Sequence, residues 1–142
     1  MITIVAEIGQ NHNGDLLLAL DMCTAARDAG VDVVKFQKRT PSLAVPKEQQ
    51  GVPKDTPWGK MTYLEYRERL EFGIPEYVEV DRHCNNLGIQ WTVSVWDEPS
   101  FELMRSNFPR LPFYKIPSAC LTDDSLLEAV ASTEVPVVLS TG

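Results

Sequence analysis

Five apolar, strand-like runs are spaced along this chain of 142 residues, and stretches with helical periodicity separate them. Each run ends in a cluster of polar or charged side chains. The runs cover residues 2–9, 31–38, 89–96, 113–118 and 135–142. Apolar strands that alternate with helices are typical of a parallel sheet built from βα units. The pattern therefore predicts an α/β fold with five such strands.

Polar groups at the C-terminal ends of parallel strands are the way in which a (β/α)8 TIM barrel builds its active site. A complete barrel needs about 250 residues, and this chain has 142. We therefore expect a partial TIM barrel of about the first five βα units. In this interpretation residues 1–142 are the truncated N-terminal portion of a barrel domain.

Helix signals fill the intervals between the runs. Asp15 is placed to cap a helix that Gly30 ends. Residues 39–62 contain four prolines and predict a long loop, which is either a lid or substrate loop or a plain surface excursion. Thr122 or Asp123 caps the last helix. The other helices are expected at 63–72, at 76–87 with Pro75 in the first turn and Gly88 at the end, at 99–107 and at 125–132.

The charge, the cysteines and the hydropathy of the chain indicate where such a protein works and what it does not bind. The formal net charge is −7 and the sequence pI about 4.8, which argues against binding of nucleic acid or anionic membranes. The three cysteines are odd in number and lack CxxC spacing, which favours a reducing cytoplasm. No apolar stretch approaches the roughly 20 residues of a membrane span. We expect a soluble cytoplasmic protein.

The strand ends supply the candidate binding residues. Lys35 and Lys115 follow apolar residues of strands that should be buried, and an unpaired charge there is costly, so a functional role is favoured. Glu7 also lies in an apolar strand that should be buried, so a functional role is favoured for it as well. Lysines and hydroxyl groups at one mouth suit a small anion with phosphate and carboxylate groups. The further polar residues at these ends are Gln37, Lys38, Thr92, Ser94, Ser118 and Ser140, of which the serines equally well only end strands.

Six tracts stand in order along the chain: EIGQNHNG at 7–14, VKFQK at 34–38, WGK at 58–60, LEF at 70–72, YKIPS at 114–118 and LSTG at 139–142. His12, in the first tract, is expected to be a loop residue, because a single histidine cannot form a metal site. Together the six tracts resemble the sialic acid synthases (the N-acetylneuraminate synthase family).

The resemblance implies a condensation of phosphoenolpyruvate with an N-acetylated amino-hexose of the N-acetylmannosamine type. The products would be a sialic acid-type nonulosonate and phosphate. Glu7 and Lys35 would be catalytic, Glu7 beside the amino-sugar and the metal, with Gln37 near the same pocket. The residues implied to hold phosphoenolpyruvate are Lys35, Ser94, Lys115, Ser118 and Ser140.

The same resemblance implies a divalent metal, manganese or magnesium, whose histidine ligands come from later strands and are absent from this chain. It also implies a homodimeric full-length enzyme with a C-terminal antifreeze-like domain, which is likewise absent. Many members carry Glu or Asp, a proposed acid–base group, where this chain has Cys120. Asp123 or Asp124 could substitute for it.

Two alternatives stay open. The chain could be an inert half-barrel that at most binds phosphoenolpyruvate, or another phosphoenolpyruvate-dependent aldol synthase that makes a seven- or eight-carbon sugar acid. The sequence also leaves open which amino-sugar is used and whether it is phosphorylated.

Overall fold

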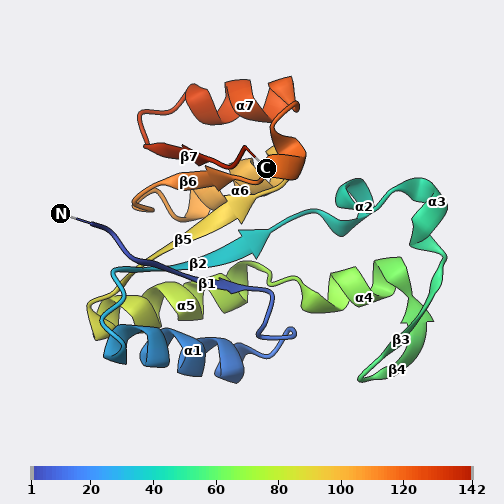
Figure 1. Ribbon diagram of the computed structural model, residues 1–142, viewed down its shortest axis with the longest axis horizontal. Helices are drawn as coiled ribbons and strands as arrows, with labels where there is room; N and C mark the ends of the chain where they lie inside the picture. Colours follow the sequence, from blue (N-terminus) through green and yellow to red (C-terminus); the bar gives the residue numbers. More distant parts are fainter. Residues whose placement is uncertain (1, 142) are drawn as a thin grey trace.

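The main sheet has five strands in the order β1-β2-β5-β6-β7, all pairs being parallel (Figure 1). The computed structural model describes residues 2–141. Neighbouring strands follow one another along the chain, with helices between them, which confirms the predicted α/β order. Within the described residues β1 and β7 are the edges of an open sheet. The strands are β1 Val5–Gly9, β2 Val33–Lys38, β5 Gln90–Val95, β6 Tyr114–Ile116 and β7 Val137–Leu139.

Side-chain caps and glycine fix the ends of the helices. The Asp15 and Asp123 side chains each accept a backbone N–H at 3.1 Å, so Asp123 rather than Thr122 caps the last helix. Gly88, with φ 71°, ends α5 as expected. The helices are α1 Leu16–Asp28, α4 Tyr63–Leu70, α5 Ile74–Leu87, α6 Glu98–Asn107 and α7 Asp124–Ala131, with a 3-10 turn, η1, at Ser118–Cys120.

One face of the sheet carries the hydrophobic core. Alternate residues of a strand point to opposite faces, and Val34 and Phe36 of β2 belong to the buried cluster together with Val93 of β5. Helices α1, α5, α6 and α7 all contribute to this cluster. In Figure 1 α1 and α5 lie side by side under the sheet. The other face is left to the polar side chains that alternate with the core residues.

The prediction that residues 39–62 form one long loop was wrong; whether the segment is a lid or a surface excursion stays a prediction. This segment contains two short helices, α2 Pro41–Ala44 and α3 Lys47–Gln50, and a hairpin of β3 Pro53–Thr56 and β4 Gly59–Thr62. Pro41 occupies the first turn of α2, where a missing N–H costs nothing. Gly59 adopts φ 101°, which closes the tight turn between the two hairpin strands. Prolines that predicted breaks therefore start elements instead, and the hairpin lies beyond α4, away from the sheet (Figure 1).

The strands are shorter than their apolar runs predicted. Ser118 lies in η1 and Ser140 follows β7, so neither is inside a strand; Gly142 lies outside the described residues. Val137, Val138 and Leu139 of β7 remain 39–49% exposed. In the described part of the chain, no helix combines the length and the apolar character needed to cross a membrane.

Candidate active site

A row of polar side chains crosses the face of the sheet opposite to the helices. In the parallel register Glu7 of β1 lies beside Lys35 of β2, and Ser94 of β5 lies beside Lys115 of β6. Lys35 is buried, with only 8% of the residue exposed. It forms an ion pair with Glu7 and donates a hydrogen bond of 2.9 Å to the Ser94 hydroxyl. The structure therefore brings three of the predicted site residues into direct contact.

Lys115 places a second cation next to Lys35. Partial burial lowers the pKa of Lys115, and the positive charge of Lys35 lowers it further, while Glu7 opposes the change. One carboxylate thus faces two ammonium groups. Such an excess of positive charge at the ends of parallel strands can attract a small anion into this otherwise acidic chain.

The other predicted hydroxyls lie at the same end of the sheet without joining this row. Ser118 is exposed in η1, directly after β6. The backbone N–H of Ser140 donates to the Ile116 carbonyl at 3.1 Å, which keeps the ends of β6 and β7 adjacent. Among the hydrogen bonds of residues 2–141, none joins either serine side chain to Lys35 or Lys115. Their part in anion binding stays a prediction.

A pocket of about 470 Å³ adjoins Glu7. Glu7 and Gln37 form the wall nearest to Lys35, and Gly9 lies between them. Gly9 has φ 58°, and a Cβ there would lie 3.2 Å from Glu7 Oε1 and 3.3 Å from Gln37 Nε2. Both polar groups therefore closely flank the end of β1. The rest of the lining includes Gln10, Arg39, Trp96, Tyr66 and Arg67.

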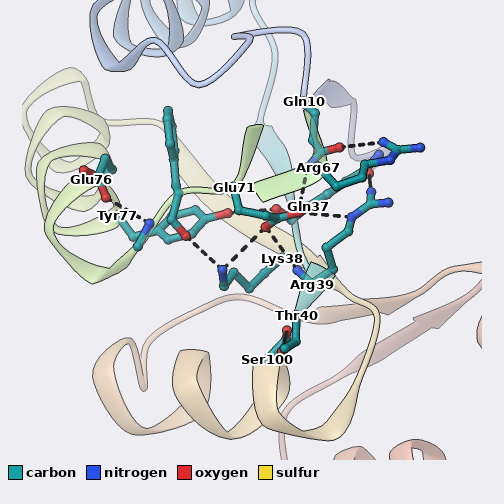
Figure 2. Close-up of polar contacts among 12 residues, drawn as sticks. Gln10, Gln37, Lys38, Arg39, Thr40, Arg67, Glu71, Glu76, Tyr77 and Ser100 are labelled. Carbon is teal, nitrogen blue, oxygen red and sulfur yellow. Dashed lines mark hydrogen bonds and ion pairs between the residues drawn. The ribbon is translucent and has the colours of Figure 1, made fainter. Parts of the chain in front are cut away.

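Glu71 is the centre of a polar network that the sequence did not predict (Figure 2). Its carboxylate accepts from Gln10 Nε2 at 2.6 Å and lies 3.1 Å from Arg39 Nε and 3.5 Å from Lys38 Nζ. Burial raises the pKa of Glu71, and the two cations partly oppose this. The LEF tract was a signal for this residue, but not for its partners. Glu71 follows the last residue of α4, so its backbone is extended and the side chain reaches the end of β2.

Lys38 accordingly does not belong to the anion-binding row, contrary to expectation. It alternates with Lys35 and Gln37 along β2, so it lies on the other face of the sheet. There its ammonium group is paired with Glu71 and donates to the Phe72 carbonyl at 2.9 Å. These two interactions of the Lys38 ammonium group join the end of β2 to the residues that follow α4.

Arg39 fixes the orientation of Gln37. Arginine has only donors, so the atom that receives the hydrogen bond from Arg39 Nη2 is Gln37 Oε1. The amide nitrogen of Gln37 then faces Gly9 and the pocket. The guanidinium group also lies 4.2 Å from the ring centroid of Trp96, which gives a cation–π contact. The pocket wall is thereby held in one arrangement.

The remaining reactive side chains have structural partners. His12 is a buried loop residue, as predicted: it stacks on Phe72 and its Nδ1 accepts the Gly14 N–H at 3.1 Å. Cys120 donates to the Trp96 carbonyl at 3.4 Å, and burial raises the pKa of its thiol. Within residues 2–141 there is no group of three or more His, Cys, Asp or Glu side chains that could hold a metal ion.

Comparison with known proteins places this geometry in a family. The model of the NeuB family matches residues 22–142. The chain belongs to the NeuB family. This NeuB-family chain is 38% identical to N-acetylneuraminate-9-phosphate synthase of Drosophila melanogaster and 35% identical to N,N'-diacetyllegionaminic acid synthase of Legionella pneumophila. The matches cover 99% and 98% of this chain, and 38% and 39% of those proteins. The chain thus spans about two-fifths of the length of these relatives.

This chain is also similar to a solved structure of a sialic acid synthetase. The N-acetylneuraminic acid synthetase of Leptospira borgpetersenii, in complex with citrate, superimposes with a TM-score of 0.85 at 27% identity. The match covers 99% of this chain and 45% of that one. The predicted resemblance to sialic acid synthases is therefore confirmed at the level of the family.

Proposed function

We propose that the protein containing this chain condenses phosphoenolpyruvate with an N-acetylated amino-hexose, giving a sialic acid-type nonulosonate and phosphate. The observation that carries the proposal is the row of Glu7, Lys35, Ser94 and Lys115 beside an open polar pocket. The names of the relatives, which are synthases of nonulosonic acids, support it.

In this proposal Lys35, Ser94 and Lys115 hold the phosphate and carboxylate groups of phosphoenolpyruvate. Two ammonium groups with one carboxylate between them leave a positive charge that a strongly anionic substrate would neutralise. The Ser94 hydroxyl, already bonded to Lys35, would turn toward an anionic oxygen. Ser118 and Ser140, at the neighbouring strand ends, would complete the cradle.

Glu7 and Gln37 would contact the amino-sugar, since both line the pocket. The reaction forms one bond between the alkene carbon of phosphoenolpyruvate and the aldehyde carbon of the sugar. The aldehyde oxygen gains a proton and becomes a hydroxyl group. Water adds to the adjacent cationic carbon, and phosphate departs with its bridging oxygen. Holding the two substrates in contact would supply much of the rate enhancement.

The divalent metal that the family resemblance implies finds no fitting ligand cluster among residues 2–141. His12 is stacked on Phe72, and His83 lies 2.9 Å from the Thr24 hydroxyl on the helical side of the sheet. We therefore assign no step of the reaction to a metal held by this part of the chain.

We also propose that residues 1–142 form the first five βα units of a (β/α)8 barrel in a homodimeric, cytoplasmic enzyme. All four helices that cover the core lie on one face, as on the outside of a barrel, and the polar row would face its interior. The exposed apolar side chains of β7 fit this proposal, since a next strand would cover them.

The test is phosphate release from phosphoenolpyruvate by the protein at the length found in its source. N-acetylated amino-hexoses, phosphorylated or not, should support release. Arabinose 5-phosphate and erythrose 4-phosphate should not. Release with only one of the latter sugars would replace the proposal by another aldol synthase, and release with none would leave an inert half-barrel.

A further inference from the structure

Glu71 is a buried carboxylate that lies behind the wall of the pocket. Its side chain is 7% exposed and is not part of the lining, whereas Gln10, Gln37 and Arg39 all line the pocket. It holds Arg39 at two points: the Arg39 backbone N–H donates to Glu71 Oε2 at 3.3 Å, and Arg39 Nε lies 3.1 Å from Glu71 Oε1. No other carboxylate of residues 2–141 lies within ion-pair distance of Arg39. The position of this arginine therefore depends on Glu71 (Figure 2).

Arg39 determines which group of the Gln37 amide faces the pocket. A guanidinium group only donates, so the oxygen of the amide receives the hydrogen bond from Arg39 Nη2. If the amide were turned over, its NH2 group would meet the guanidinium group, donor against donor. The Gln37 nitrogen has no acceptor within residues 2–141, and its N–H groups are free for a ligand. The wall thus offers donors to the pocket as long as Arg39 stays in place.

The same carboxylate fixes a second amide, that of Gln10. Its nitrogen donates to Glu71 Oε1 at 2.6 Å, and its oxygen accepts from Arg67 Nη1 at 3.2 Å. Both ends of this amide are engaged, so Gln10 joins the residues after β1 to α4. Glu71 therefore connects the two strand ends, of β1 and of β2, that carry this side of the pocket.

We propose that Glu71 is a positioning residue: through Arg39, its charge turns the Gln37 amide so that the N–H groups face an acceptor oxygen of the amino-sugar. The inference rests on the proposed function and adds a residue on which binding of the second substrate depends. Removal of one partner from a buried ion pair leaves an uncompensated charge, so without Glu71 the Arg39 guanidinium group would leave Gln37. The competing explanation is that Glu71 only fastens α4 to the end of β2 through Lys38.

The test is steady-state phosphate release by the protein at its native length. The sugar is N-acetylmannosamine or its 6-phosphate, whichever supports release. Glu71→Gln keeps the size of the side chain and removes its charge. It should raise the KM for the sugar about 3- to 10-fold, the effect of one hydrogen bond on binding. The KM for phosphoenolpyruvate should not change, because Lys35 pairs with other residues than Glu71. Glu71→Asp keeps the charge and should restore part of the sugar affinity.

Variants of Gln37 test whether Glu71 acts through this amide. In a Gln37→Ala background, Glu71→Gln should raise the KM for the sugar no further, whereas effects that multiply would overturn the inference. Gln37→Glu is an independent test that leaves Arg39 with a partner. Its carboxylate still accepts from Arg39 but has no N–H for the sugar, so the KM for the sugar should rise. A wild-type KM in Gln37→Glu would also overturn the inference.

Two control variants separate positioning from folding. Lys38→Gln removes the other cation that pairs with Glu71, on the opposite face of the sheet. It should lower the midpoint of urea unfolding and keep the wild-type KM for the sugar. Glu68→Gln changes an exposed glutamate of α4 and should match the wild type in both measurements. If Lys38→Gln raised the KM for the sugar as much as Glu71→Gln, the role of Glu71 would be structural and the inference would be wrong.

The outcomes distinguish this inference from the proposed function. An unchanged KM for the sugar in Glu71→Gln, or an equal rise in the KM of both substrates, would overturn the role of Glu71 and leave the synthase proposal intact. Absence of phosphate release by the wild type with every amino-hexose would overturn the proposed function and this inference with it.

Discussion

His12 is a buried imidazole whose protonation we expect to weaken the fold as the pH falls. Its ring is 2% exposed and stacks on Phe72, with the two centroids 4.0 Å apart. Burial lowers its pKa from 6.5 to about 4, while a hydrogen bond to the Gly9 backbone and the charge of Asp15 oppose the change. Because His12 belongs to the segment 9–13, whose other residues line the pocket, the site should be lost together with this stability.

The magnitude follows from the two pKa values. A base with a lower pKa in the folded state contributes stability that is present above about pH 6.5 and is lost as the pH falls toward 4. Each pKa unit corresponds to about 1.4 kcal/mol, so the shift from 6.5 to about 4 sets an upper limit of roughly 3.5 kcal/mol.

Urea unfolding of the native-length protein at several pH values between 7 and 4 measures this loss. His12→Phe keeps a stacked ring that cannot be protonated, and it loses the acceptor for the Gly14 N–H, which costs about 1 kcal/mol at every pH. Its stability should therefore depend less steeply on pH than that of the wild type. His83→Phe is the control and should retain the wild-type slope. Equal slopes for wild type and His12→Phe, or an NMR titration of His12 near pH 6.5, would refute the reasoning.

Three further changes test other parts of the structure. Lys35→Ala should raise the KM for phosphoenolpyruvate about 10- to 100-fold, and steady-state kinetics with an unchanged KM would contradict our assignment. Gly14 has φ 76°, and a Cβ in Gly14→Ala would lie 2.3 Å from the Arg69 carbonyl oxygen, so this change should lower the unfolding free energy by more than about 2 kcal/mol. In the same urea titration the control Gly51→Ala should be nearly neutral, because open space surrounds the position of its Cβ. Cys120→Ser should leave the pH–rate profile unchanged, because the thiol is a buried donor to a carbonyl; a shifted profile would make it an acid–base group.

The order of strands and helices could be predicted because each signal is local. Apolar runs, aspartate caps and Gly88 all act within a few residues of the element that they define. The contact of Glu7 with Lys35 follows from one additional rule, that consecutive parallel strands align their C-terminal ends. The structure agrees at these positions, since Glu7 and Lys35 are partners in the register.

The network around Glu71 could not be predicted, because its partners are distant in sequence. Glu71 lies 61 residues from Gln10 and 32 or 33 from Arg39 and Lys38. Only the path of α4 back toward β2 brings them together. The elements of residues 39–62 were missed for a related reason: proline both ends and starts helices, and the choice depends on what surrounds it.

Successive side chains of β2 point to opposite faces of the sheet, so Lys35 and Lys38 have different partners. Lys35 and Gln37 point to the polar face, where Lys35 meets Glu7 and Ser94. Lys38, one residue beyond Gln37, points to the other face and is neutralised by Glu71. Arg39 follows the strand and shares Glu71, yet it also reaches Gln37 and the pocket. Since one carboxylate serves both Lys38 and Arg39, the same alternation that gives Lys38 a partner at the end of the strand leaves Arg39 to share that partner and to line the pocket.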